Sequence, residues 1–406
     1  MTPRILLGLD AAPGTVPTWM AALPHALAAD GPALLPLPDG PRSLRDRLVA
    51  DLRANDPKAP VDPDGAGGAR VALVVPTSGS TGMAKGVQLT SAALLASAAG
   101  TQARLDGPGT WVLALPHTHI AGLMVLIRSL VAGTEPVVVR LDGGFRPQQF
   151  ADATAQALGS AGGRPLYTSL VPTQLDRLLD ASVDLTGYSA VLVGAAVTPS
   201  PLLDRARSAG ARIVTTYGMT ETCGGCVYEG APLSGVTVAV DGSGRVVLGG
   251  LTLFSGYRMQ PELTAACTGP AGELVTNDLG RLHPDGRLEI LGRADDVIIS
   301  GGENVVPSPV EDALRAQPGV RQCVVVGVAD PEWGQRVVAV VEMDGVEPGH
   351  LADAATEDLR RALRSELPAG WLPRQVVVTA RLPMLPSGKP DPAAVRDLAQ
   401  TARERG

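Results

Sequence analysis

Cysteine and aromatic residues are both scarce in this sequence. Of its 406 residues, 4 are cysteine and 3% are aromatic. Four cysteines do not make a disulfide framework in a chain of this length, and the single Cys-x-x-Cys, Cys223 to Cys226, has no second pair or nearby histidines to complete a zinc site. The cysteines therefore argue against a disulfide-rich secreted protein and against a redox or zinc centre.

An excess of positive charge and a long apolar run are also absent. The formal net charge is -7 at pH 7, which argues against a nucleic-acid partner and offers no polybasic membrane anchor. Near the N-terminus the apolar run ILLGL begins after Arg4 and ends at Asp10, too short for a signal peptide or a membrane-spanning segment. We expect a cytoplasmic protein of two or three domains without membrane insertion, either monomeric or homo-oligomeric.

Glycine is abundant, with 48 residues, and the most informative glycines lie in PTSGSTGMAKG, residues 76 to 86. Glycine lets the backbone approach an anion, hydroxyl groups add donors and Lys85 adds a positive charge, so this stretch predicts a phosphate-binding loop before a helix capped by Thr90. An ordinary Gly/Ser turn is the alternative for any few of these residues alone. The P-loop of nucleoside triphosphatases does not fit, because Lys85 follows Ala84 rather than glycine. The candidate nucleotide-binding residues are Thr77, Ser78, Gly79, Ser80, Thr81, Gly82 and Lys85.

Apolar and amphipathic runs alternate between residues 71 and 217. The apolar runs suit buried strands and the amphipathic runs suit helices, which predicts an α/β fold with a doubly wound, mostly parallel sheet and a ligand beyond the carboxyl ends of its strands. Residues 54–70, rich in Pro, Gly and Asp, predict an exposed loop, and residues 1–53 show helical spacing at 19–29 and 44–52. The expected strands lie near residues 71–75, 111–115, 136–140, 165–170, 189–193 and 212–216.

The pattern changes after residue 230. Short strands separated by Gly, Pro and Asp turns predict a β-rich subdomain, and residues 296–406 are about the right size for a small α+β domain. In that last part we expect helices and strands in the order helix 309–316, strand 322–328, strand 336–342, helix 351–366 and strand 375–379.

A second informative stretch, TTYGMTETCGG at residues 215 to 225, follows an expected strand. Tyr217 can cover a nucleotide base, Thr220 can bond a phosphate, and Glu221 can ligate Mg²⁺, a hard cation that prefers carboxylate and phosphate oxygens. A polar loop with a packed tyrosine is the alternative. The loop LPHTHIAGL brings His117 and His119 together before an apolar helix, where a buried, hydrogen-bonded histidine is the commoner outcome for one such residue.

Several motifs, in chain order, resemble those of the acyl-adenylate-forming (ANL) superfamily: TSGSTGMAKG, YGMTE, TNDLG, LGRAD and PSGK. The resemblance implies that Asp278 accepts the ribose hydroxyls, that Arg293 contacts the ribose and that Asp295 is a hinge. It also implies that Lys389 is the catalytic lysine, which bridges the substrate carboxylate and the α-phosphate. Asn277 departs from the family pattern, which has glycine there.

The resemblance further assigns residues around the base and the acyl group. It places Thr216, Tyr217, Gly218 and Thr220 around the nucleotide. The stretch VLVGAAV ends an expected strand in small residues, so the backbone of Gly194, Ala195 and Ala196 could lie flat against the purine; by itself this stretch is a tight strand-to-helix turn. His119 and Thr222 would border the acyl pocket, and Arg128 is a candidate for holding a second substrate carboxylate.

The activity implied by the resemblance is that of an AMP-forming acid-thiol ligase. A carboxylic acid and Mg·ATP give an acyl adenylate and pyrophosphate, and coenzyme A then displaces AMP. The implied domains are residues 1–294 and a mobile small domain, 295–406. Within the superfamily, LPHTHIAGLMVLIRSLVAG and TTYGMTETCGGCVYEG resemble the o-succinylbenzoate-CoA ligases of menaquinone biosynthesis. Another aryl- or acyl-CoA synthetase, a stand-alone adenylation domain and a catalytically silent nucleotide-binding protein are the alternatives.

Overall fold

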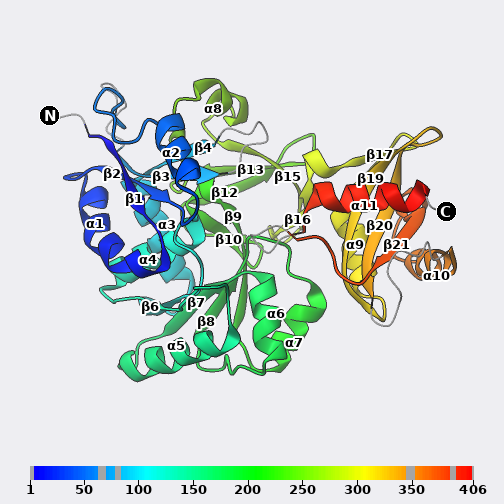
Figure 1. Cartoon of the computed structure of the whole chain (residues 1–406), viewed down its shortest axis with the longest axis horizontal. Coiled ribbons are helices and arrows are strands. Elements are labelled where there is room, and N and C mark those ends of the chain that lie inside the picture. The colour runs from blue at the N-terminus through cyan, green and yellow to red at the C-terminus, as the bar shows by residue number, and fades with distance from the viewer. Residues whose placement is uncertain (1–3, 63–69, 78–83, 344–352, 385–389, 405–406) are drawn as a thin grey trace.

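The computed structural model describes residues 4–62, 70–77, 84–343, 353–384 and 390–404. Figure 1 shows a large N-terminal part and a small C-terminal part, the latter coloured yellow to red and gathered at one end of the molecule. No helix within the described ranges is long and apolar enough to span a bilayer.

The first sheet contains the strand that leads into the predicted phosphate loop. Its order is β1-β2-β3-β4-β14, with β1, β2 and β3 parallel, β4 antiparallel to β3 and β14 antiparallel to β4. The sequence placed β3 in the doubly wound sheet and did not predict β1 or β2, so this part of the prediction was wrong. The elements are β1 (Leu6–Asp10), α1 (Val16–Ala28), β2 (Ala33–Leu37), α2 (Arg42–Asp51), β3 (Val71–Thr77), β4 (Lys85–Thr90) and β14 (Gly256–Tyr257).

The second sheet is the predicted doubly wound one. Its order is β11-β10-β9-β8-β7-β5-β6, and the five strands from β9 to β6 are parallel. Buried side chains of α3 and α4 pack on one face, and those of α5, α6 and α7 pack on the other. The strands are β5 (Thr110–Leu113), β6 (Val137–Val138), β7 (Leu166–Leu170), β8 (Ala190–Val193), β9 (Ile213–Met219), β10 (Gly224–Tyr228) and β11 (Ala231–Pro232); the helices are α3 (Ser91–Arg104), α4 (Ile120–Ala132), α5 (Pro147–Ser160), α6 (Pro172–Asp180) and α7 (Ser200–Ser208).

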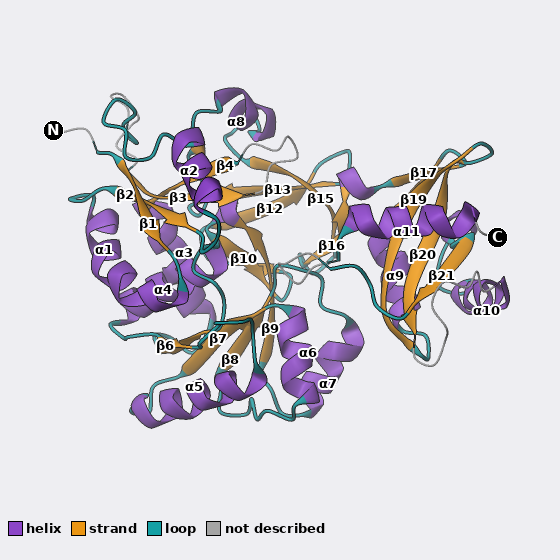
Figure 2. Ribbon diagram, in the orientation of Figure 1, coloured by secondary structure: helices purple, strands orange, loops and turns teal. Residues whose placement is uncertain are grey.

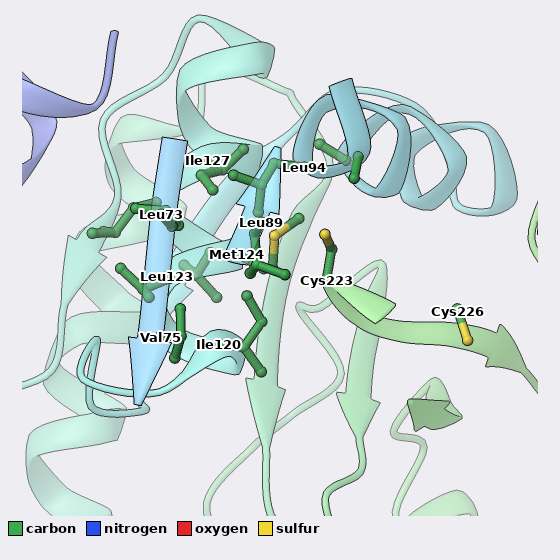
Figure 3. Close-up of a cluster of buried hydrophobic side chains, with 14 of the residues drawn as sticks. Leu73, Val75, Leu89, Leu94, Ile120, Leu123, Met124, Ile127, Cys223 and Cys226 are labelled. Carbon is green, nitrogen blue, oxygen red and sulfur yellow. The ribbon is translucent and has the colours of Figure 1, made fainter. Parts of the chain in front are cut away.

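Helix α4 lies inside the core between the two sheets. It is apolar around most of its circumference, as expected for a helix buried on all sides, and it ends at Gly133, whose φ of 64° is the left-handed conformation that favours glycine. Figure 3 shows its side chains Ile120, Leu123, Met124 and Ile127 beside those of β3, β4 and α3. Cys223 and Cys226 also belong to this cluster, so they are buried core residues.

The remaining strands form two further sheets (Figure 2). The antiparallel sheet β12-β13-β15-β16 is the predicted β-rich subdomain, and the C-terminal sheet has the order β18-β17-β20-β19 with β21 beside β20. The hairpin of β17 and β18 and the final helix were not predicted. The bounds are β12 (Val236–Val240), β13 (Arg245–Gly250), α8 (Pro261–Cys267), β15 (Leu274–Leu282), β16 (Leu288–Arg293), β17 (Ile298–Ser300), β18 (Glu303–Val305), α9 (Pro307–Arg315), β19 (Val320–Asp330), β20 (Gly334–Met343), α10 (Asp353–Leu363), β21 (Gln375–Thr379) and α11 (Pro392–Glu404).

The segment predicted as an exposed loop is packed over its described part, residues 54–62. Ala54, Ala59 and Val61 are buried. The buried guanidinium of Arg258 donates to the carbonyl oxygens of Leu52, Arg53, Ala59 and Pro60 at 2.7, 3.5, 2.6 and 3.3 Å. A buried cation needs such acceptors, and here they fix the backbone of the segment.

Candidate active site

The predicted phosphate loop connects two antiparallel strands. Thr77, the last residue of β3, pairs with Lys85, the first residue of β4. Residues 78–83, which include Ser78, Gly79, Ser80, Thr81 and Gly82, lie outside the described residues. After β4, Thr90 caps α3 as predicted, because its Oγ1 accepts a hydrogen bond of 3.1 Å from the backbone N–H of Ala93.

The carboxyl ends of β8 and β9 lie side by side and supply the predicted base-binding backbone. Gly194 directly follows β8, and a Cβ there would lie 2.3 Å from Thr216 Oγ1, so only glycine fits this close approach. Ala195 has a φ of 66°, and Ala195 and Ala196 are both exposed. At Gly218 a Cβ would meet the carbonyl oxygen of Gly224 at 2.1 Å. These contacts fix an exposed backbone surface beside Tyr217.

Glu221 lies in a short helical turn, η2 (Thr220–Thr222), immediately after β9. Tyr257 donates a hydrogen bond of 2.7 Å from its hydroxyl to Glu221 Oε1. The ammonium of Lys85 lies 5.8 Å from the centroid of the Tyr257 ring. Tyr257 thus contacts both Glu221, the predicted magnesium ligand, and Lys85 of the predicted phosphate loop. The sequence did not single out Tyr257.

Tyr217 and Asp278 meet on the other side of this turn. The Tyr217 hydroxyl donates a hydrogen bond of 2.7 Å to Asp278 Oδ2, and Asp278 is paired in register with Arg293 across β15 and β16. Arg293 Nη1 lies 3.6 Å from Asp278 Oδ1, and its Nη2 lies 3.5 Å from Asp295 Oδ2. Asn277 Nδ2 also donates to Asp295 Oδ2, at 2.6 Å. The predicted ribose and hinge residues therefore form one polar network.

The two residues assigned to the acyl pocket have different environments. His119 is exposed and directly precedes α4. Thr222 is completely buried, and its single hydroxyl proton has two acceptors within reach, the carbonyl oxygens of Met219 and Gly224 at 3.1 and 2.8 Å. It also accepts from the Met219 N–H at 2.9 Å. The Thr222 hydroxyl thus closes the turn that carries Glu221, and its role toward the substrate stays a prediction.

His117 lies on the same loop as His119 but faces the N-terminal helix. It is 2% exposed, its Nε2 lies 3.1 Å from Thr15 Oγ1, and its ring makes an edge contact with Trp19 at 5.8 Å. Burial lowers the pKa of His117 to about 4, so the ring is neutral at pH 7. His117 is the buried, hydrogen-bonded histidine that is common in protein cores.

Arg128, the candidate for holding a second substrate carboxylate, is buried. It is nine residues beyond His119 along α4, which is roughly 13 Å of helix at 1.5 Å per residue. Its buried guanidinium donates to the Tyr228 hydroxyl at 3.3 Å and stacks 5.1 Å from the ring of Trp111, at the amino end of β5. Arg128 Nε is buried without a hydrogen-bond partner among the described residues, and its role toward a second substrate carboxylate stays a prediction.

The donor set fits a magnesium ion that arrives with a nucleotide. Within the described ranges no group of three or more His, Cys, Asp or Glu side chains could hold a metal by itself. Glu221 Oε1 accepts a hydrogen bond from Tyr257, and the Glu221 carboxylate forms no ion pair with the described residues. Mg²⁺ commonly takes one or two carboxylates and completes its octahedron with phosphate oxygens and water, so a single carboxylate is sufficient.

Lys389 lies outside the described residues, but the chain on either side of its loop is defined. Met384 and Pro390 form an isolated antiparallel bridge, and the Asp391 N–H donates to the carbonyl oxygen of Pro383 at 2.9 Å. Residues 383–384 and 390–391 are thus held together by backbone pairing.

Comparison with known families supplies the class of protein. The model of the AMP-binding enzyme family matches residues 23–257, and that of the AMP-binding enzyme C-terminal domain matches residues 309–389. The chain belongs to the AMP-binding enzyme family. The resemblance to the acyl-adenylate-forming superfamily is thereby confirmed, and so is the α/β fold with a large N-terminal and a small C-terminal domain.

Two curated relatives and one solved structure show how far the similarity extends. A probable 2-succinylbenzoate--CoA ligase of Mycobacterium tuberculosis is 44% identical over 384 residues, covering 93% of this chain and 94% of that protein. A sulfoacetate--CoA ligase of Cupriavidus necator is 35% identical over 411 residues, covering 92% and 75%. Escherichia coli MenE, solved with a bound m-phenylether-linked analogue of OSB-AMS, is 28% identical with a TM-score of 0.74, covering 98% and 89%.

Proposed function

We propose that this AMP-binding enzyme is an ATP-dependent 2-succinylbenzoate-CoA ligase that acts through an acyl-adenylate intermediate, in the cytoplasmic synthesis of menaquinone. The observation that carries the adenylation is the meeting of Lys85, Tyr257 and Glu221 beside the network of Tyr217 and Asp278. The choice of acid is supported by the near full-length similarity to the mycobacterial relative.

In the first half-reaction an oxygen of the substrate carboxylate attacks the α-phosphorus of ATP, and pyrophosphate leaves. Two anions must approach each other, so the step depends on neutralising charge more than on acid-base catalysis. We assign Lys85 and Lys389 to this task, with Thr220 donating to the α-phosphate. Glu221 would hold Mg²⁺, which supplies further neutralisation of phosphate charge when bound.

The nucleotide is held by residues that do not react. We assign the base to the ring of Tyr217 and the backbone of residues 194–196, and the ribose to Asp278 and Arg293. A carboxylate offers about four acceptor positions, so the hydrogen bond from Tyr217 leaves Asp278 able to accept both ribose hydroxyls.

In the second half-reaction the thiol of coenzyme A attacks the acyl carbonyl carbon, and AMP leaves with the oxygen that joined it to the acyl group. The thiol gives up its proton in this step. We place the domain boundary at residues 294/295 and the hinge at Asp295, so that rotation of residues 295–406 removes Lys389 and brings the turn at Ser300–Asn304 toward the thiol. That turn is the β17–β18 hairpin.

A different acid is the strongest alternative, because the sulfoacetate--CoA ligase of C. necator is also similar over most of this chain. CoA-thioester formation should therefore be measured by mass spectrometry with 2-succinylbenzoate, benzoate, sulfoacetate and a long-chain fatty acid. We expect 2-succinylbenzoate to give the highest kcat/KM. A higher value for any other acid would overturn the assignment of the substrate, and the absence of pyrophosphate exchange with every acid would indicate a silent nucleotide-binding protein.

A further inference from the structure

Tyr257 lies where three separate segments of the chain meet. It belongs to β14, which pairs with β4 so that Tyr257 is opposite Val87, two residues after Lys85. Its hydroxyl donates to Glu221 Oε1, in the turn after β9, at 2.7 Å. The strand that leaves the phosphate loop and the turn that carries the proposed metal ligand are therefore connected through one side chain.

The position of the Tyr257 ring is fixed by its surroundings. Its backbone N–H donates to Thr264 Oγ1 at 2.8 Å, and its ring meets that of Phe254 edge to face at 5.0 Å. The Phe254 N–H also donates to the carbonyl oxygen of Glu221 at 2.8 Å. Residues 254–257 thus hold Glu221 twice, through its main chain and through its carboxylate.

The Tyr257 hydroxyl is the donor in this hydrogen bond. An ionised carboxylate has no proton to give and can only accept, so the bond runs from Tyr257 to Glu221. Glu221 Oε1 has this donor, whereas for Oε2 the structure gives no hydrogen bond within its described ranges. The hydrogen bond therefore distinguishes two otherwise equivalent oxygens.

We infer that Tyr257 is a positioning residue that orients the Glu221 carboxylate for magnesium, keeping Oε1 occupied and presenting Oε2 to the metal. This inference rests on the proposed function of Glu221 as the metal ligand. Partners that orient a ligating side chain typically change metal affinity or activity by about 10- to 100-fold when they are removed. The same ring lies beside the ammonium of Lys85, so it also helps to place the positive charge near the triphosphate.

Tyr257→Phe tests the hydroxyl alone, because the ring against Phe254 and Lys85 is retained. Mn²⁺ binding should be followed by the electron paramagnetic resonance signal of free Mn²⁺, with enzyme and a non-hydrolysable ATP analogue and without any acid. We expect Tyr257→Phe to weaken Mn²⁺ binding about 10-fold or more. The affinity for the analogue without metal should change less than about 2-fold, because the rest of the nucleotide pocket is retained.

A double-mutant cycle with Glu221→Gln shows whether Tyr257 acts through Glu221. If it does, Tyr257→Phe should weaken Mn²⁺ binding no further once Glu221 is replaced. Tyr188→Phe is the matched control. The buried Tyr188 hydroxyl also makes a hydrogen bond of 2.7 Å, to Thr154, and Tyr188 belongs to a separate hydrophobic cluster, so removing this hydroxyl should leave Mn²⁺ binding unchanged.

Unchanged Mn²⁺ binding in Tyr257→Phe, or additive losses in the cycle, would overturn the inference. Equal losses of metal-dependent and metal-free nucleotide binding would also overturn it, because they would indicate a general packing role. These binding measurements need no turnover, so they remain decisive if the protein proves inactive toward 2-succinylbenzoate, an outcome that would contradict only the proposed function.

Discussion

The Tyr217 hydroxyl donates a hydrogen bond of 2.7 Å to Asp278 Oδ2 and so ties the carboxyl end of β9 to β15. Burial and Asp278 raise the pKa of Tyr217, which keeps the phenol protonated and able to donate at neutral pH. The residue proposed for the base and the residue proposed for the ribose are thus fixed relative to each other before a nucleotide binds.

Replacing Asp278 should weaken ATP binding specifically. A hydrogen bond to a charged group contributes roughly 1.5 to 3 kcal/mol, so loss of the ribose acceptor in Asp278→Ala should raise the KM for ATP about 10-fold or more. Steady-state kinetics with varied ATP measure this. Asp285→Ala, at an exposed turn between β15 and β16, is the control, and an ATP KM that responds equally to both substitutions would contradict the ribose assignment.

Removing the Glu221 carboxylate should impair the adenylation step itself. With one protein carboxylate proposed for the metal, Glu221→Ala should lower kcat about 100-fold or more, by analogy with the loss of one preorganised charge-stabilising group. Pyrophosphate exchange at several Mg²⁺ concentrations measures the effect. Glu262→Ala, an exposed acidic residue in the first turn of α8, should keep the wild-type rate. Near wild-type exchange by Glu221→Ala would show that another group binds the metal.

The two half-reactions should respond to different substitutions. Lys389→Ala should lose adenylation but still convert supplied acyl adenylate into thioester, because the lysine is assigned only to the first step. Separate assays of acyl-adenylate formation and of thioester formation from added acyl adenylate distinguish these outcomes. Equal loss of both steps would contradict the assignment of Lys389.

Asp295→Pro should give the opposite pattern. Asp295 lies in a 3-10 turn, η3 (Ala294–Asp296), where the φ of proline is allowed, so the substitution should hold the hinge without unfolding it. We expect adenylation to be spared and thioester formation to be slowed. If both steps stay at wild-type rates, Asp295 is not the hinge.

Buried His117 should make stability depend on pH. The pKa of His117 is about 4 in the folded chain and about 6.5 in the unfolded chain. Between pH 4 and pH 6.5 the imidazole is therefore protonated in the unfolded chain but neutral in the folded one. The free energy of unfolding should therefore fall as pH is lowered from about 6.5 toward 4, by at most about 1.4 kcal/mol per pH unit from this group. Urea unfolding at pH 7 and pH 5 measures it.

In His117→Gln the difference between the two pH values should shrink. His25→Asn is the control, because His25 is exposed on α1 and its pairing with Asp30 is at the surface. An undiminished pH dependence in His117→Gln would mean that other groups account for it.

The sequence predicted the parts of the site that depend on local chemistry. The turn after β9 could be read from YGMTE because its aromatic, hydroxyl and acidic residues lie within five positions, and the doubly wound sheet followed from alternating apolar and amphipathic runs. The four strands of the β-rich subdomain were similarly marked by Gly and Asp turns. Local patterns sufficed in these regions because each element's neighbours in sequence are also its neighbours in space.

The sequence did not predict the features that depend on distant partners. β1 and β2 are short apolar runs, and β2 contains Pro36, so the sequence pattern could not distinguish either of them from a buried helix or a loop. Because β1 and β2 were not predicted, β3 was assigned to the wrong sheet. Tyr257 lies 36 positions from Glu221 in the sequence, and nothing in its local pattern indicates that contact. The contacts of Arg128 with Tyr228 and Trp111 could not be predicted either, because a lone arginine in an apolar helix does not show which distant side chains it meets.

The most direct test of the central claim follows oxygen from the acid to AMP. 2-Succinylbenzoate labelled with ¹⁸O in its aliphatic carboxylate should be incubated with enzyme, Mg·ATP and coenzyme A, and the nucleotide product should be analysed by mass spectrometry. Attack of that carboxylate on the α-phosphorus predicts AMP carrying one ¹⁸O. Unlabelled AMP, which attack by the aryl carboxylate would give, or ADP as the product would contradict the proposed reaction.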